Sequence, residues 1–222
     1  MQNSQLPLNF IVRQDYRSED FLQSKSNEMA FRALESWPNW TTYGLILCGE
    51  NKVGKTHLAH IFCRKTKGLF LQKENLKNLD QFERFIQRGK PYILDEPDLL
   101  KEGDEQNLFH LCNLIKERGA FILIIAEKSP SYWGIHLKDL ESRLSVFPTI
   151  QIQAPEEELL EAILVKKVSE LQIDLDTSVS HYILTHTERS AEFLITLLDK
   201  LNKESLIHQR KITVPFVKKF LE

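Results

Sequence analysis

The sequence predicts an α/β fold in which a parallel sheet is flanked by helices and followed by a small helical domain. Short apolar runs alternate with helix-like stretches between residues 44 and 152, which is typical of a parallel sheet with crossover helices. A glycine-containing loop follows the first apolar run and opens a helix. After Pro155 the pattern contains only helices. We therefore expect an α/β domain at 13–154 and a helical domain at 155–222.

The strands are predicted from apolar runs bounded by turn residues. These runs are 44–48, 68–71, 92–94, 120–126 and 149–152. The run 120–126 is the most continuous of them, as expected of a central strand that is buried on both faces.

The helices are predicted from apolar residues at three- and four-residue spacing. They are 56–62, 78–88 and 104–118 in the first domain, and 156–171, 176–186, 190–208 and 214–221 in the second. The expected inner faces are Leu79, Phe82, Phe85 and Ile86 in one helix, and Leu108, Leu111, Cys112 and Ile115 in the next. Thr213, with Pro215 in the first turn, forms a regular helix start.

A complete phosphate-binding motif lies between the first strand and the first helix of the α/β domain. It consists of Gly49, Glu50, Asn51, Lys52, Val53, Gly54, Lys55 and Thr56, and His57 follows it. Backbone N–H groups of such a loop and the helix N-terminus bind phosphate, while Lys55 contacts the β- and γ-phosphates and Thr56 binds Mg²⁺. The alternative is an accidental match in an ordinary turn, but the flanking strand and helix are the context that the motif requires.

Two carboxylates follow the predicted strand 92–94. In a nucleotide site of this class, the first acid, Asp95, holds Mg²⁺ through water, and Glu96 polarises the attacking water. Asp98 is a weaker candidate for the same place. A solvated strand end is the alternative, and the phosphate loop before it favours the metal site.

Composition excludes several classes of function. The net charge of −2 argues against DNA binding as the main role. Cys48, Cys63 and Cys112 stand far apart in apolar runs, so we expect small buried side chains and no metal cluster. There is no membrane-spanning apolar stretch and no signal peptide, and we expect a cytoplasmic protein with no membrane contact.

Arg143 has two interpretations from its residues alone. It is either an ordinary charge on a helix surface or an arginine finger that reaches the γ-phosphate bound by a neighbouring subunit. The composition does not separate these interpretations.

The order of these features resembles the AAA+ ATPases, and more narrowly the DnaA and Hda proteins. The matching segments are Asp20-Phe21-Leu22, Ser26-Asn27 with Ala30, Trp37-Pro38-Asn39-Trp40, Gly54 to His60, Leu137 to Leu144, and Ile212 to Val217. The resemblance implies a P-loop core with a helical lid, bound ADP or ATP with Mg²⁺, and Arg143 as an arginine finger acting in trans. It also implies sensor 1 near Glu127 and sensor 2 near 190–200, where Arg189, one turn before Glu192, is the candidate. Lys52 and Val53 replace the small residues usual in the family's loop.

The N-terminal segment 1–12 contains Gln5-Leu6-Pro7-Leu8-Asn9-Phe10, which resembles the peptide by which replication proteins bind the bacterial sliding clamp. The apolar side chains of Leu6, Leu8 and Phe10 would enter a groove, and Gln5 would supply an oriented polar contact. A tail that folds back on the core is the alternative.

The resemblance implies a negative regulator of replication initiation that stimulates ATP hydrolysis by DnaA, with DnaA and the DNA polymerase III beta sliding clamp as partners. Because the sequence ends after the lid, we expect no helix-turn-helix domain and no direct sequence-specific DNA binding. Self-association, the resident nucleotide and hydrolysis by this chain itself stay open. The alternatives are a stand-alone AAA+ ATPase or helicase-loader-like protein acting on DNA, and a pure adaptor without nucleotide chemistry.

Overall fold

The computed structural model describes residues 21–71, 83–95 and 104–221. These residues form two compact units, one at 25–153 and one that joins residues 21–24 to the chain from Ala154 onward. Residues 21–24 were predicted to belong to the α/β domain, but they group with the helical unit. One reason is that the Ser24 hydroxyl donates a 2.8 Å hydrogen bond to the Glu156 carboxylate.

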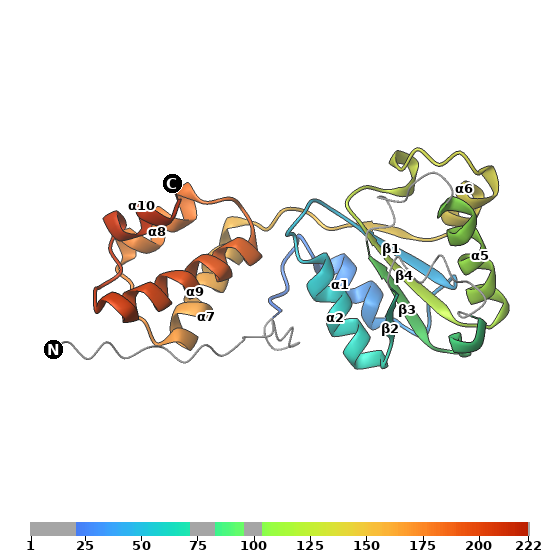
Figure 1. The fold of residues 1–222 in the computed structure, drawn as a ribbon, viewed down its shortest axis with the longest axis horizontal. Coiled ribbons are helices and arrows are strands. Elements are labelled where there is room, and N and C mark those ends of the chain that lie inside the picture. The colour runs from blue at the N-terminus through green and yellow to red at the C-terminus, as the bar shows by residue number, and fades with distance from the viewer. Residues whose placement is uncertain (1–20, 72–82, 96–103, 222) are drawn as a thin grey trace. The chain divides into compact units, whose positions relative to one another are not determined.

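The unit at 25–153 is built on a five-stranded parallel sheet with the order β2-β3-β4-β1-β5 (Figure 1). Its strands are β1 Gly44–Cys48, β2 Leu69–Leu71, β3 Pro91–Asp95, β4 Phe121–Ala126 and β5 Thr149–Gln151. The predicted fold class and all five predicted strands are confirmed. The central strand β4 is buried over all but its first residue, because helices cover both faces of the sheet.

Helices pack on both faces of this sheet, with α1 and α2 on one side and α5 and α6 on the other (Figure 1). Their bounds are α1 Glu28–Glu35, α2 Lys55–Thr66, α5 Asp104–Glu117 and α6 Lys138–Ser145, with a 3₁₀ turn, η3, at Pro130–Tyr132. The predicted inner face of α5 is confirmed, since Leu108, Leu111, Cys112 and Ile115 are fully buried. They share a core with Ile46 of β1 and Leu140 of α6.

Helix α1 was not predicted. It is short, and its buried face consists of Ala30 and Leu34, while Met29 is exposed. The four-residue spacing of Ala30 and Leu34 is the only apolar pattern that could have indicated it.

The helix predicted at 78–88 ends at Phe85 within the described residues. The Tyr92 hydroxyl donates to the Phe85 carbonyl at 2.7 Å and accepts from the Gln87 N–H at 2.9 Å, so it takes the place of the next helical turn. Ile86 is buried as predicted, but the placement of Phe85 on the inner face was wrong, since this side chain is 65% exposed. Leu79 and Phe82 lie outside the described residues.

The second unit contains the four predicted helices. They are α7 Glu157–Leu171, α8 Thr177–His186, α9 Ala191–His208 and α10 Val214–Leu221. Their buried side chains include Leu160, Leu164, Ile183, Leu194, Leu198, Leu201 and Val217. Ser190 caps α9, because its buried hydroxyl accepts a 3.1 Å hydrogen bond from the Phe193 N–H.

The three cysteines are at least partly buried in the structure. Cys48 and Cys112 are buried as predicted and Cys63 is partly buried, all as free thiols. Burial raises the pKa of Cys112 to about 12, so this thiol stays protonated.

Within the parts that the structure describes, no helix combines the length and apolar character needed to cross a bilayer.

Candidate nucleotide site and arginine pocket

The phosphate loop leaves the carboxyl end of β1 and is tied there to both neighbouring strands. The Gly49 N–H donates to the Glu127 carbonyl after β4 at 3.1 Å, and the Ile152 N–H after β5 donates to the Cys48 carbonyl at 2.7 Å. A Cβ atom at Gly49 would lie 2.7 Å from the Ile152 carbonyl oxygen. The backbone therefore approaches too closely for any residue but glycine at the start of the loop.

Lys55 is the first residue of α2 and is only 8% exposed. Its Nζ atom donates to the carbonyl oxygens of Gly49 at 2.6 Å and Glu50 at 2.7 Å, so the cation is held inside the loop. Burial raises the pKa of the adjacent Cys48 thiol, and the positive charge of Lys55 opposes that increase. Together with the N-terminus of α2, this geometry presents positive charge to a phosphate.

The other loop residues surround this lysine. Gly54 adopts a left-handed conformation with φ +100° at the start of α2, Thr56 is exposed in the first turn, and His57 is partly buried. Lys52 also has positive φ, at +66°. A positive φ of this kind costs a non-glycine residue about 1–2 kcal/mol, so Lys52 strains the backbone of the loop.

Asp95 is the last residue of β3 and is partly buried. It is in register with Ile125 of β4, which is in register with Leu47 of β1, so Asp95 and the loop lie at the same edge of the sheet. A carboxylate and the Thr56 hydroxyl are oxygen ligands of the kind that Mg²⁺ takes alongside nucleotide phosphates. Glu96 and Asp98 lie outside the described residues.

The described residues contain no set of side chains that would bind a metal ion in the absence of a nucleotide. Within 21–71, 83–95 and 104–221, no group of three or more His, Cys, Asp or Glu side chains is arranged to hold a metal ion. The residues present fit an ion that arrives with a nucleotide, since the phosphates and water molecules then supply most of its ligands.

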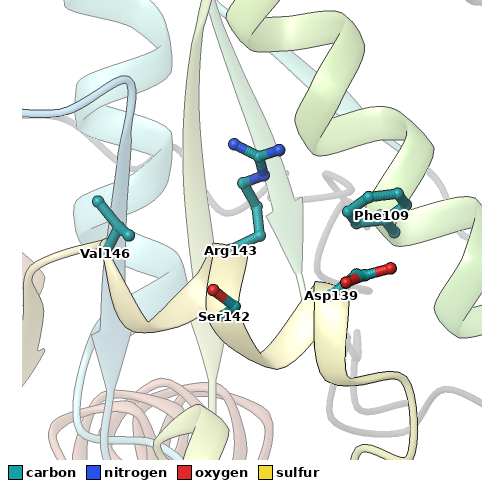
Figure 2. A pocket seen from close by; sticks show the side chains of 5 residues that line it. All are labelled: Phe109, Asp139, Ser142, Arg143 and Val146. Carbon is teal, nitrogen blue, oxygen red and sulfur yellow. The ribbon is translucent and has the colours of Figure 1, made fainter.

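Arg143 projects from α6 toward α5 and lines a pocket of about 250 Å³ with Phe109, Asp139, Ser142 and Val146 (Figure 2). Its guanidinium carbon lies 6.0 Å from the centroid of the Phe109 ring. Among the residues that the structure describes, Arg143 forms no ion pair, although Asp139 stands one turn earlier on the same helix. The guanidinium therefore lies near the Phe109 ring, and no carboxylate of the described residues neutralises its charge.

Tyr43 locates this pocket relative to the sheet. Burial raises the pKa of Tyr43, and the nearby Arg143 charge opposes this increase. Because Tyr43 directly precedes β1, the arginine pocket lies at the amino end of that strand and the phosphate loop at its carboxyl end. The structure therefore does not bring Arg143 to the chain's own phosphate loop.

Comparisons with known proteins agree with this architecture. Residues 156–221 match the family model described as the Hda lid domain. The DnaA protein of Buchnera aphidicola subsp. Cinara cedri is 28% identical over 99% of this chain and 55% of its own length. An uncharacterized protein of Haemophilus influenzae is 28% identical over 99% of both chains. Domain III of Thermotoga maritima DnaA superposes with a TM-score of 0.79 at 20% identity, covering 94% of this chain and 98% of that domain.

The chain is therefore related to DnaA over nearly its whole length and carries an Hda-type lid. It spans about half the length of the curated DnaA relatives that it matches, 55% of one and 51% of another. AMPPCP-bound DnaA from Aquifex aeolicus shares the fold with a TM-score of 0.72 at 20% identity, covering 90% of this chain and 68% of that one.

Arg189 is the residue that the resemblance suggested for sensor 2. Arg189 is exposed and directly precedes Ser190, the residue that caps α9, so it lies just before the helix that carries Glu192. The sensor 2 role of Arg189 stays a prediction.

The segment predicted to bind the sliding clamp lies outside the described residues. The role of Gln5, Leu6, Leu8 and Phe10 therefore stays a prediction.

Proposed function

We propose that this chain is a negative regulator of DNA replication initiation that acts on ATP-bound DnaA. In this proposal the chain binds an adenine nucleotide in its own phosphate loop and docks on the sliding clamp through residues 5–10. Arg143 then enters the nucleotide site of DnaA and stimulates hydrolysis there, which leaves DnaA bound to ADP.

The observation that carries the proposal is the state of Arg143. A guanidinium without an ion pair in the described chain, at the far end of β1 from the chain's own loop, is suited to a phosphate bound by another molecule. Charge on the transferring γ-phosphoryl group is what such an arginine stabilises, and fingers of this kind raise hydrolysis rates by roughly 10³–10⁵-fold in GTPases. The Hda-type lid and the DnaA-related core support DnaA as the partner.

The phosphate loop supports binding of ADP or ATP by the chain itself. Lys55 and the N-terminus of α2 would hold the phosphates, and Thr56 with Asp95 would hold Mg²⁺ beside them. The relationship to AMPPCP-bound DnaA supports an adenine nucleotide. The metal, when bound, supplies positive charge next to the phosphates.

The test is ATP hydrolysis by ATP-loaded DnaA with this protein added, with and without DNA-loaded clamp. We expect acceleration that needs the clamp, is lost in Arg143→Ala and persists in Arg118→Ala. Arg118 is a matched control because it is an exposed arginine of the same unit. Gln5→Ala should remove the effect of the clamp without changing the fold.

Each other outcome favours a different function. Function that survives Arg143→Ala but not Gln5→Ala identifies an adaptor. No acceleration by a folded, nucleotide-bound sample refutes the proposal, and DNA-stimulated hydrolysis by the chain alone would then identify an ATPase acting on DNA.

A further inference from the structure

Helix α5 contacts the α6 segment through two side chains on one face. Glu105 lies in the first turn of α5 and Phe109 lies one turn later, so both project toward the same neighbour. Glu105 contacts the chain that enters α6, and Phe109 contacts the Arg143 side chain that α6 carries. Sequence reasoning named the buried residues of α5 but neither of these two.

Glu105 fixes the start of α6. Its carboxylate accepts hydrogen bonds from the Leu137 N–H at 2.7 Å and from the His136 N–H, which lies 3.1 Å from both oxygens. Leu137 occupies the N-cap position of α6, and its apolar side chain provides no cap. A carboxylate from another helix therefore binds these N–H groups and places negative charge at the positive end of α6.

Phe109 holds the guanidinium itself. The 6.0 Å distance from the Arg143 carbon to the ring centroid lies at the limit for a cation–π contact. An arginine four residues after an aspartate normally has the option of an ion pair with it on a helix surface. Here Arg143 lies over the ring, and Asp139 does not neutralise the charge that a phosphate would need.

We infer that Glu105 and Phe109 are positioning residues that set the place and direction of the Arg143 guanidinium. Glu105 acts through the backbone of α6, and Phe109 acts through the ring. The inference rests on the proposed function only where the readout is hydrolysis by DnaA.

The first test measures the order of the Arg143 side chain in the full chain alone. The protein is labelled with ¹⁵N-arginine, the Arg143 Nε–Hε resonance is assigned by its absence in Arg143→Lys, and its steady-state ¹H–¹⁵N NOE is recorded. We expect a high NOE in the wild type, a clear loss in Phe109→Leu and Glu105→Gln, and retention in Phe109→Tyr. Glu117→Gln is the matched control, since Glu117 is an exposed acid at the other end of α5.

The second test uses clamp-dependent hydrolysis by ATP-loaded DnaA. Phe109→Leu should lower the maximal rate about three- to fivefold, the value of a partly exposed cation–π contact, while the concentration for half-maximal stimulation stays the same. Phe109→Tyr should restore the rate. If Phe109 had a purely structural role, Phe109→Leu would instead lower the melting temperature and raise the concentration for half-maximal stimulation, and Phe109→Tyr would not restore either value.

The two proposals fail in different ways. An Arg143 NOE that is equal in the wild type, Phe109→Leu and Glu105→Gln overturns the inference even if Arg143→Ala abolishes hydrolysis. Changed NOE values together with a harmless Arg143→Ala overturn the proposed function and leave the positioning intact. If Phe109→Leu fails to fold, Glu105→Gln decides alone.

Discussion

Lys55 and Arg143 are cations of the same α/β unit that are held in opposite ways. Lys55 is 8% exposed, and its ammonium group donates to two carbonyl oxygens of the loop that precedes it. Arg143 lies on an aromatic ring at the edge of an open pocket and makes no ion pair with any described residue. The first arrangement suits a ligand bound by the chain itself, and the second suits a ligand that another molecule brings.

The strongest test of this contrast is Arg143→Ala. We expect the rate of stimulated hydrolysis by DnaA to fall by roughly 10³-fold or more in a single-turnover assay, since a finger contributes mainly to the transition state. Arg143→Lys should also be defective, because a point charge does not replace the planar fork. Nucleotide affinity of the variant itself should be unchanged, and a parallel loss of that affinity would contradict the separation of the two sites.

The reciprocal test is Lys55→Ala. Loss of charged hydrogen bonds to the phosphates should weaken ADP binding by this chain about 100-fold, measured by isothermal titration calorimetry. The Arg143 Nε–Hε resonance should keep its position, because the two groups lie at opposite ends of β1. A shift of that resonance would mean that the two cations are coupled.

A smaller effect is expected from the strained position of Lys52 in the loop. Lys52→Gly should be about 1 kcal/mol more stable to urea unfolding than Lys52→Ala, because only glycine adopts the φ of +66° without strain. Both variants lack the lysine side chain, so their difference isolates the backbone. Equal unfolding midpoints would show that the loop relaxes and is less rigidly built than the geometry around Lys55 indicates.

The smallest effect concerns pH and the helix that follows the loop. Burial lowers the pKa of His60 in α2 and the Arg64 charge lowers it further, so the unfolded chain binds this proton more readily than the folded chain. Stability from His60 is therefore present above the unfolded pKa of about 6.5 and is lost as pH falls below it. His60→Phe, which keeps a ring against Phe70, should lose less stability between pH 7.5 and 5.5 than the wild type. An equal loss would assign the pH dependence to other groups.

The two sites differ in how far the sequence predicts them. The loop is a contiguous segment whose conformation is set by its own glycines and its flanking strand and helix, so Lys55 was identified with its neighbours. Arg143 was identified by resemblance, but its surroundings come from Phe109 and Tyr43, which are distant in the sequence. No local pattern specifies which ring a guanidinium will meet, since this follows from the packing of α5 on α6.

Contacts between residues distant in the sequence also explain where the predicted fold was wrong. The buried strands and the α5 face follow from local apolar patterns and were predicted correctly. The end of the helix at Phe85 depends on the Tyr92 hydroxyl, a tertiary contact that apolar spacing does not reveal. The start of α9 at Ala191, one residue after the predicted bound, follows from the Ser190 cap.

The location of the two cations at opposite ends of β1 has a consequence for symmetry. A strand of five residues separates them by about 15 Å. A contact that brings the arginine end of one molecule to the phosphate-loop end of another joins unlike surfaces, so it is heterologous. Each such contact leaves one surface of each kind unused, and repetition of the contact builds a ring or a filament. Such an array would stop growing when a different protein covers the phosphate-loop surface at its end.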